Sequence, residues 1–227
     1  MAISLFIIIA LIMSAVVHEY AHGWMAYRLG DDTAKNAGRL TMNPIKHLDL
    51  FGSVLLPLIL VISGSSFFIA WAKPVPFNPY LLRDKKYGSM KVAVAGPASN
   101  AIMAVIFGLI VRFLPVPMLI KHDLVINLLQ DTNSVLAMMS GSFLNSIFVM
   151  FLLLCFINII LMVFNLIPIP PLDGSKVIYP FLPTPLKRLF HKIEPFGIWV
   201  LIFLIAFGVF SFISILTLYL ISFLTGL

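Results

Sequence analysis

Apolar residues in this chain run in long stretches that are separated by short polar connections. Stretches whose lengths approach the roughly 20 residues needed to span a hydrocarbon core predict membrane-crossing helices. We interpret the first stretch as one retained helix, because no basic residue precedes it and it runs on into polar residues. The predicted apolar segments are Ile3–Leu29, Phe51–Trp71, Val92–Leu114, Phe143–Asn165 and Pro195–Leu227.

The composition gives the class of protein. Hydrophobic residues make up 61% of the 227 residues and charged residues only 11%, against about 25% charged in an ordinary soluble domain. We therefore expect an all-α polytopic membrane protein with about four to six transmembrane helices. No polar stretch is long enough for a separate soluble domain. Residues 1–227 are expected to form one membrane-embedded domain, with a core at about 1–180 and C-terminal helices in 181–227.

The net charge of +6 does not indicate nucleic-acid binding. The basic residues lie mostly between the apolar segments, as is typical of the cytoplasmic loops of membrane proteins, and no basic face interleaved with aromatic residues is present. The expected surroundings are the lipid bilayer, with no nucleic-acid partner. Cys155 is the single cysteine, which excludes an intramolecular disulfide and a cysteine-based zinc site.

The strongest candidate for chemistry is the sequence His18-Glu19-Tyr20-Ala21-His22, an H-E-x-x-H pattern on a predicted helix. A spacing of four places both imidazoles on one helix face, one turn apart, where they can bind one metal ion. Glu19 lies beside that face and can take a proton from a water molecule there. The alternative is a hydrated, inert helix end. Three ionisable side chains in one membrane turn are costly without a shared partner, which favours the metal.

A catalytic zinc needs three protein ligands and one open position, so a third ligand is expected elsewhere in the chain. Asp173 is the candidate, because it closes an apolar run behind three prolines, whereas the other aspartates lie in polar loops. The alternative is a simple turn, since Asp173-Gly174 is ordinary turn chemistry. The residues alone leave both readings open.

Two motifs together resemble the site-2 protease family of intramembrane metalloproteases, whose signatures are H-E-x-x-H and N-x-x-P-x-x-x-L-D-G. The first is met by His18–Gly23 and the second by Asn165–Gly174, in the family's order. The stretch Ala95–Asn100, which reads A-G-P-A-S-N, is also similar to a family helix between them. The resemblance covers about residues 10–180 and is closest to the compact prokaryotic members without a PDZ or CBS domain.

This resemblance implies an intramembrane zinc metalloendopeptidase. It implies one zinc ion per chain, bound by His18, His22 and Asp173, with Glu19 as the general base. The implied partners are transmembrane proteins, cleaved at peptide bonds in or next to their membrane segments.

For Asn165 and Asn100 the resemblance suggests a part in holding the substrate or stabilising the oxyanion. An interhelical hydrogen bond is the alternative for either asparagine. The competing functions for the whole chain are a membrane metal or ion transporter and a proteolytically inactive homologue that only binds helices. A transporter would want further intramembrane carboxylates or histidines along a path, and an inactive homologue usually lacks the general base, yet Glu19 is present.

A shared metal also predicts the topology. The two histidines lie toward the C-terminal end of the first helix and Asp173 follows the end of Phe143–Asn165, so these two helices must run in the same direction. If both Phe51–Trp71 and Val92–Leu114 crossed the membrane, the two helices would run in opposite directions. Phe51–Trp71 is therefore expected to be a re-entrant or interfacial hairpin. This topology leaves Arg112 and Lys121 outside and the other 13 of the 15 basic residues on the cytoplasmic side. We expect a multi-pass cell-membrane protein whose active site opens toward the cytoplasm.

A substrate helix must be unwound before its carbonyl groups can be attacked. An edge strand in the protease could hold the extended segment by β-augmentation. Ala37–Met42 is the candidate for such a small membrane-embedded β element.

Overall fold

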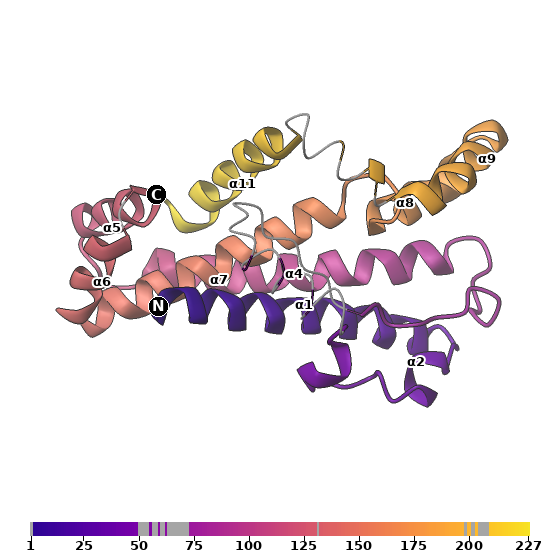
Figure 1. Ribbon diagram of the computed structural model, residues 1–227, viewed down its shortest axis with the longest axis horizontal. Helices are drawn as coiled ribbons and strands as arrows, with labels where there is room; N and C mark the ends of the chain where they lie inside the picture. The colour runs from indigo at the N-terminus through magenta and orange to yellow at the C-terminus, as the bar shows by residue number, and fades with distance from the viewer. Residues whose placement is uncertain are drawn as a thin grey trace. The chain divides into compact units, whose positions relative to one another are not determined.

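The computed structural model describes residues 2–49, 73–130, 132–197, 199–200 and 209–227, together with the single positions 55, 59, 62 and 203. All regular structure in these residues is helical, which confirms the predicted all-α fold (Figure 1). The predicted hairpin at Phe51–Trp71 lies almost entirely outside the described residues, as does the middle of the last apolar segment. Their predicted structure stays a prediction.

Three helices are long and apolar enough to cross a membrane. They are α1 (Ala2–Arg28), of which Leu5–Arg28 is the candidate span, α4 (Gly88–Phe113) and α7 (Phe143–Asn165). The ends of α1 and α7 agree with the predicted segments to within one residue, and α4 starts four residues earlier than Val92. Apolar residues occupy all faces of these helices, as is usual for helices that contact both lipid and protein. The polytopic membrane fold is thus confirmed.

The chain divides into two compact units, each with its own buried core. The first comprises residues 1–10, 100–164 and 202–227. It contains two shorter helices between α4 and α7, namely α5 (Met118–Gln130) and α6 (Thr132–Ser140), which contact each other. It also contains the C-terminal helix α11 (Val209–Thr225). Its core includes Val111, Leu124, Val135, Phe148 and Leu152.

A buried lysine closes the end of α4 in this first unit. Nζ of Lys121 donates to the carbonyl oxygens of Val111 and Arg112, both at 3.0 Å. These carbonyls have no partner further along their own helix, because a helix leaves its last four carbonyl groups unpaired. The side chain of Lys121 therefore caps the C-terminal end of α4.

The second unit comprises residues 11–99 and 165–201 and contains all three predicted metal ligands. Its core is built from Ala26, Leu82 and Val92. Besides the parts of α1 and α4 that fall in it, this unit holds short helices: α2 (Thr33–Asn36), η1 (Pro44–His47), α8 (Asp173–Ile178), η3 (Tyr179–Phe181), α9 (Thr184–Ile193) and η4 (Glu194–Phe196).

A buried aspartate ties two loops of this unit together. Gly30 adopts a φ of +100° and ends α1, which suits glycine because it lacks a Cβ. The carboxylate of the fully buried Asp31 then accepts from the N–H groups of Thr33 at 3.0 Å and Asn78 at 2.6 Å. The loop around residues 73–78 is thereby anchored to the C-terminal end of α1.

The predicted β element at Ala37–Met42 is wrong. In the structure these residues form a turn and bends, and no strand occurs anywhere in the part of the chain that is described. Gly38 has a φ of +64°, which is incompatible with extended backbone, and the Arg39 N–H donates to the Ala34 carbonyl as a continuation of α2. Arg39 instead uses its side chain, whose Nη2 donates to the Lys73 carbonyl at 2.6 Å.

Candidate metal centre

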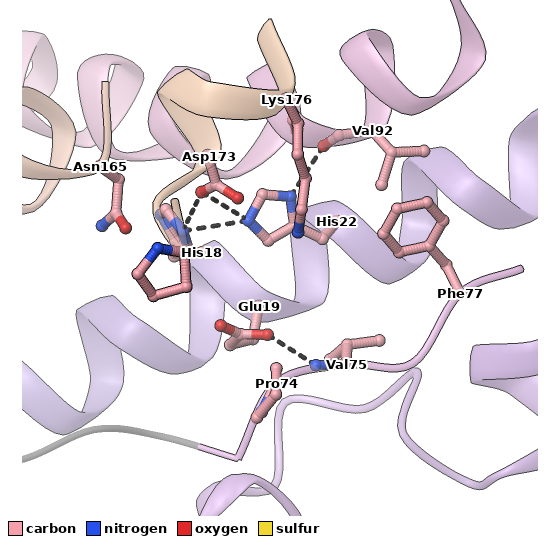
Figure 2. Close-up of a pocket in the computed structure, with 12 residues that line it drawn as sticks. His18, Glu19, His22, Pro74, Val75, Phe77, Val92, Asn165, Asp173 and Lys176 are labelled. Atoms are coloured by element: carbon pink, nitrogen blue, oxygen red, sulfur yellow. Dashed lines mark hydrogen bonds and ion pairs between the residues drawn. The ribbon is translucent and has the colours of Figure 1, made fainter. Parts of the chain in front are cut away.

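Two histidines project from one face of α1 toward the same point. Their spacing of four residues places them one helical turn apart, and the two Nε2 atoms lie 3.0 Å from each other. Both side chains are buried, with His18 6% and His22 8% exposed. The predicted juxtaposition of the imidazoles is present (Figure 2).

Asp173 meets this pair from the start of α8. Its Oδ2 lies 3.1 Å from Nε2 of His18 and 3.1 Å from Nε2 of His22. Gly174 makes this approach possible, because a Cβ at that position would overlap the carbonyl oxygens of Leu166 and Ile167. Asp173-Gly174 opens helix α8 instead of forming a turn, and the position of its carboxylate beside both histidines is the one that a metal ligand would need.

The surroundings of Asp173 favour its ionised form. Burial would raise the pKa of this carboxyl, but the contacts of its Oδ2 with the imidazoles of His18 and His22 outweigh that effect and hold the pKa below its ordinary value. An ionised carboxylate is the form that binds a metal.

A backbone contact decides which nitrogen of His22 points to the centre. Its Nδ1 lies 2.7 Å from the carbonyl oxygen of Val92 and must carry a proton to donate there. In the neutral ring Nε2 then carries the lone pair, and this lone pair faces a carboxylate oxygen and a second imidazole nitrogen at hydrogen-bond distance. A neutral imidazole with its lone pair on the inner nitrogen is the form that binds a metal, and a carbonyl that fixes the outer nitrogen is typical of metal-binding histidines.

The spacing of the three ligand atoms suits zinc. Zinc–nitrogen and zinc–oxygen bonds of about 2.0–2.2 Å in a tetrahedral arrangement separate the ligand atoms by about 3.3–3.6 Å. The observed separations of 3.0 and 3.1 Å are only a few tenths of an ångström shorter. Two imidazoles and one carboxylate are also a ligand set of the catalytic type, which leaves a fourth position open. Within the described residues, His18, His22 and Asp173 form the group that could hold a metal ion.

Gly96 on α4 provides room for both imidazoles. A Cβ built at this position would overlap Nε2 of His22 and lie 2.7 Å from Cε1 of His18. The Ala95–Asn100 stretch therefore contributes to the centre through the absence of a side chain rather than through one.

Glu19 is held by backbone from a distant loop. Its Oε2 accepts a 2.8 Å hydrogen bond from the N–H of Val75, which is 56 residues away in the sequence. Gly23 permits this approach, since a Cβ there would lie 3.0 Å from Cγ1 of Val75. The carboxylate is thus positioned beside the histidine pair with one oxygen engaged (Figure 2).

These side chains surround a cavity of about 140 Å³. Asn165 lines this cavity, as expected if it contacts the substrate. Asn100 lies in the other unit, where its Nδ2 donates to Oδ1 of Asn158 at 2.8 Å, which is the interhelical contact considered as its alternative. The residues that line the cavity are His18, Glu19, His22, Pro74, Val75, Phe77, Val92, Ala93, Asn165, Pro171, Asp173 and Lys176.

Several of these contributors were not predicted from the sequence. Val75 and Val92 act through backbone groups, which leave no signal in residue type. Lys176 was missed although its spacing of three from Asp173 places it on the same face of α8. Its Nζ lies 5.6 Å from the ring centroid of Phe77, which brings one cation to the cavity.

Comparison with known proteins agrees with this centre. Residues 6–208 match Peptidase family M50. YwhC of Bacillus subtilis strain 168, described as a candidate zinc metalloprotease, is 34% identical over 203 residues, which are 89% of this chain and 80% of YwhC. Rip2 of Mycolicibacterium smegmatis, also described as a candidate zinc metalloprotease, is 27% identical over 195 residues, 86% of this chain and 64% of Rip2. No solved structure matches the chain.

The family match covers most of the chain, and the relative with 34% identity is covered over more than two thirds of its length. The buried His-His-Asp cluster agrees with the metal dependence that the names of both relatives imply. This chain therefore belongs to peptidase family M50, the site-2 protease family that its paired motifs indicate, and it is a zinc metalloprotease of the membrane.

Proposed function

We propose that this protein is an intramembrane endopeptidase that hydrolyses peptide bonds in or next to the transmembrane segments of other membrane proteins. The observation that carries the proposal is the convergence of the buried His18, His22 and Asp173 beside Glu19 in one cavity. His18, His22 and Asp173 would hold the zinc. When bound there, zinc supplies a Lewis acid that polarises the scissile carbonyl and makes a water molecule more acidic.

Glu19 is the proposed general base. Its carboxylate lies next to the ligand histidines and accepts the proton of the attacking water, then returns it to the leaving amine nitrogen. The bond from the Val75 N–H holds one carboxylate oxygen and leaves the other for this proton. Asn165, which lines the cavity, is proposed to bind the substrate backbone through its amide.

The depth of the centre supports cleavage within the membrane. Along the candidate span Leu5–Arg28, His18 lies about 20 Å from Leu5 and about 15 Å from Arg28 at 1.5 Å per residue. That position falls inside a hydrocarbon core about 30 Å thick. The exposed side chains of the first half of α1 are apolar, among them Leu5, Ile8 and Ile9, as expected of a surface in contact with lipid.

The two competing functions gain no support. Apart from the His18, His22 and Asp173 cluster, no second group of potential metal ligands is found among the described residues, as a transport path would require. An inactive homologue would not need Glu19 and its backbone anchor. The endopeptidase remains the function that the geometry favours.

A cleavage assay tests the proposal. Wild type and Glu19→Gln are compared on single-span membrane proteins in co-expression and after reconstitution, with zinc content measured on the same samples. Glu19→Gln should lower cleavage by about 10²–10⁴-fold, because Gln cannot accept the proton, while zinc and fold are kept. The matched control is Glu194→Gln, the same substitution at an exposed glutamate in η4. Cleavage by Glu19→Gln at the wild-type rate would refute the mechanism.

A further inference from the structure

Helix α9 separates apolar from basic side chains more sharply than the spanning helices do. At about 100° per residue, Leu186, Leu189, Phe190 and Ile193 fall within an arc of about 100°. Arg188 and His191 lie on the opposite face. Lys187 and Lys192 stand about 110° to either side of the apolar centre. The helix contains three lysine or arginine residues and no acidic residue.

Nothing in the described part of the chain buries the apolar face of α9. None of its residues is buried, and Leu186 and Leu189 are 42% and 47% exposed. The helix has 10 residues and is about 15 Å long, half of what a membrane crossing needs. In a membrane protein, a short helix with an exposed apolar arc is expected to lie at the bilayer surface rather than to cross its interior.

Large aromatic side chains flank this helix at both ends. Phe181 precedes it and is 67% exposed, while Phe196 and Trp199 follow it at 62% and 68%. Aromatic residues concentrate at the level of lipid headgroups. Lys187 and Lys192 border the apolar arc at the places from which lysines reach up to phosphate groups while their aliphatic stems stay in the apolar layer.

We propose that α9 is an interfacial helix that binds anionic phospholipid. Its apolar arc lies among the upper acyl chains, and Lys187 and Lys192 contact the phosphate groups on either side. This interaction is separate from peptide hydrolysis and does not depend on the proposed function.

The metal centre is linked to this helix through Tyr179. Tyr179 follows α8, whose first residue is Asp173. Its hydroxyl lies 2.8 Å from Nε2 of His191, and Nζ of Lys187 lies 5.4 Å from the centroid of its ring. These two contacts join α9 to the residue that directly follows the helix beginning at Asp173.

Spin-label accessibility tests this proposal with the full chain and without measuring proteolysis. Nitroxides are attached to Leu186→Cys and Arg188→Cys, each in a Cys155→Ala background, and the protein is placed in nanodiscs with rising fractions of phosphatidylglycerol in phosphatidylcholine. Collisions with oxygen report the acyl region, and collisions with a water-soluble nickel chelate report solvent. The Leu186 label should become oxygen-accessible as the anionic fraction rises, while the Arg188 label stays nickel-accessible.

Charge reversal tests the lipid chemistry. Lys187→Glu/Lys192→Glu should raise the phosphatidylglycerol fraction needed for the response by about 25-fold, at about fivefold for each lost basic residue, and so abolish it in practice. The matched control is Lys85→Glu/Lys86→Glu, which reverses two exposed lysines elsewhere in the same unit and should leave the response unchanged. Nickel access at both labels would mean a solvated helix. Exclusion of both reagents at Leu186 would mean protein contact, within this chain or with a second copy. Either result overturns the proposal.

Discussion

His22 and Val92 are 70 residues apart in the sequence, yet Nδ1 of His22 donates a 2.7 Å hydrogen bond to the Val92 carbonyl. This bond joins α1 to α4 and fixes the orientation of the ring. It allows Nε2 to face His18 and Asp173. One turn further along α4, Gly96 lies against both imidazoles.

We therefore predict that Gly96→Ala loses most of its zinc. The added methyl group would overlap Nε2 of His22, and the two rings cannot both keep their positions. Intrinsic helix preference would act in the opposite direction, because alanine is favoured over glycine by about 1 kcal/mol inside a helix. Elemental analysis of purified protein measures the effect.

Gly141→Ala serves as the control for this substitution. The nearest atom to a Cβ at Gly141 is 3.8 Å away, so the methyl group fits without displacement. This variant should keep about one zinc per chain. Full zinc occupancy in Gly96→Ala would show that the imidazoles do not bind the metal in the observed arrangement.

A second prediction concerns the ligands. Purified wild-type protein should contain about one zinc per chain, and His18→Ala/His22→Ala should contain little, because one carboxylate alone does not hold the ion. The comparison is His122→Ala, which removes an imidazole from an exposed position outside the centre. If the His18→Ala/His22→Ala variant kept its zinc and the control variant lost it, the zinc site would have to lie elsewhere in the chain.

The parts of this molecule that follow from residue type were predictable from the sequence. The boundaries of α7 coincide with an apolar run, and His18, His22 and Asp173 meet as the two motifs indicate. The length of an apolar segment and the presence of metal-binding side chains depend on residue type alone, so both can be recognised in the sequence.

The parts that depend on backbone were not predictable. The Val75 N–H and the Val92 carbonyl reach the site only after the chain folds, and any residue type could supply them. The strand expected at Ala37–Met42 failed because Gly38 takes a positive φ and the preceding helix α2 extends its hydrogen bonding to Arg39. A pattern that permits extended backbone does not require it.

A third prediction separates the two roles considered for Asn100. Its bond to Asn158 is buried and 2.8 Å long, so a double-mutant cycle of Asn100→Leu and Asn158→Leu should give a coupling of about 0.6–1.7 kcal/mol in unfolding free energy. We expect the two single variants to lose similar stability and similar activity. A selective fall in kcat of about 10²–10³-fold for Asn100→Leu would instead assign it to the oxyanion.

The last prediction is that Phe51–Trp71 enters the membrane and returns to the side from which it started. The metal centre requires it, since His18 and Asp173 meet only if α1 and α7 run in the same direction. The flanking residues add an independent reason. His47 precedes the segment and Lys73 follows it, and the Lys73 N–H donates to the His47 carbonyl at 2.9 Å. Both ends of the segment therefore lie at one place, which a full crossing does not allow.

Cysteine labelling in intact cells measures this topology. In a Cys155→Ala background, Ile45→Cys and Tyr80→Cys place thiols at positions that are 74% and 86% exposed on either side of the segment. Both should be protected from a membrane-impermeant reagent until the membrane is opened, because the basic loops around them favour the cytoplasm. Ser140→Cys, beyond the α4 span, is the control that should react from outside. Labelling of Tyr80→Cys from outside with Ile45→Cys protected would mean that the segment crosses. The shared metal would then be untenable, because Asp173 would lie on the opposite side from His18.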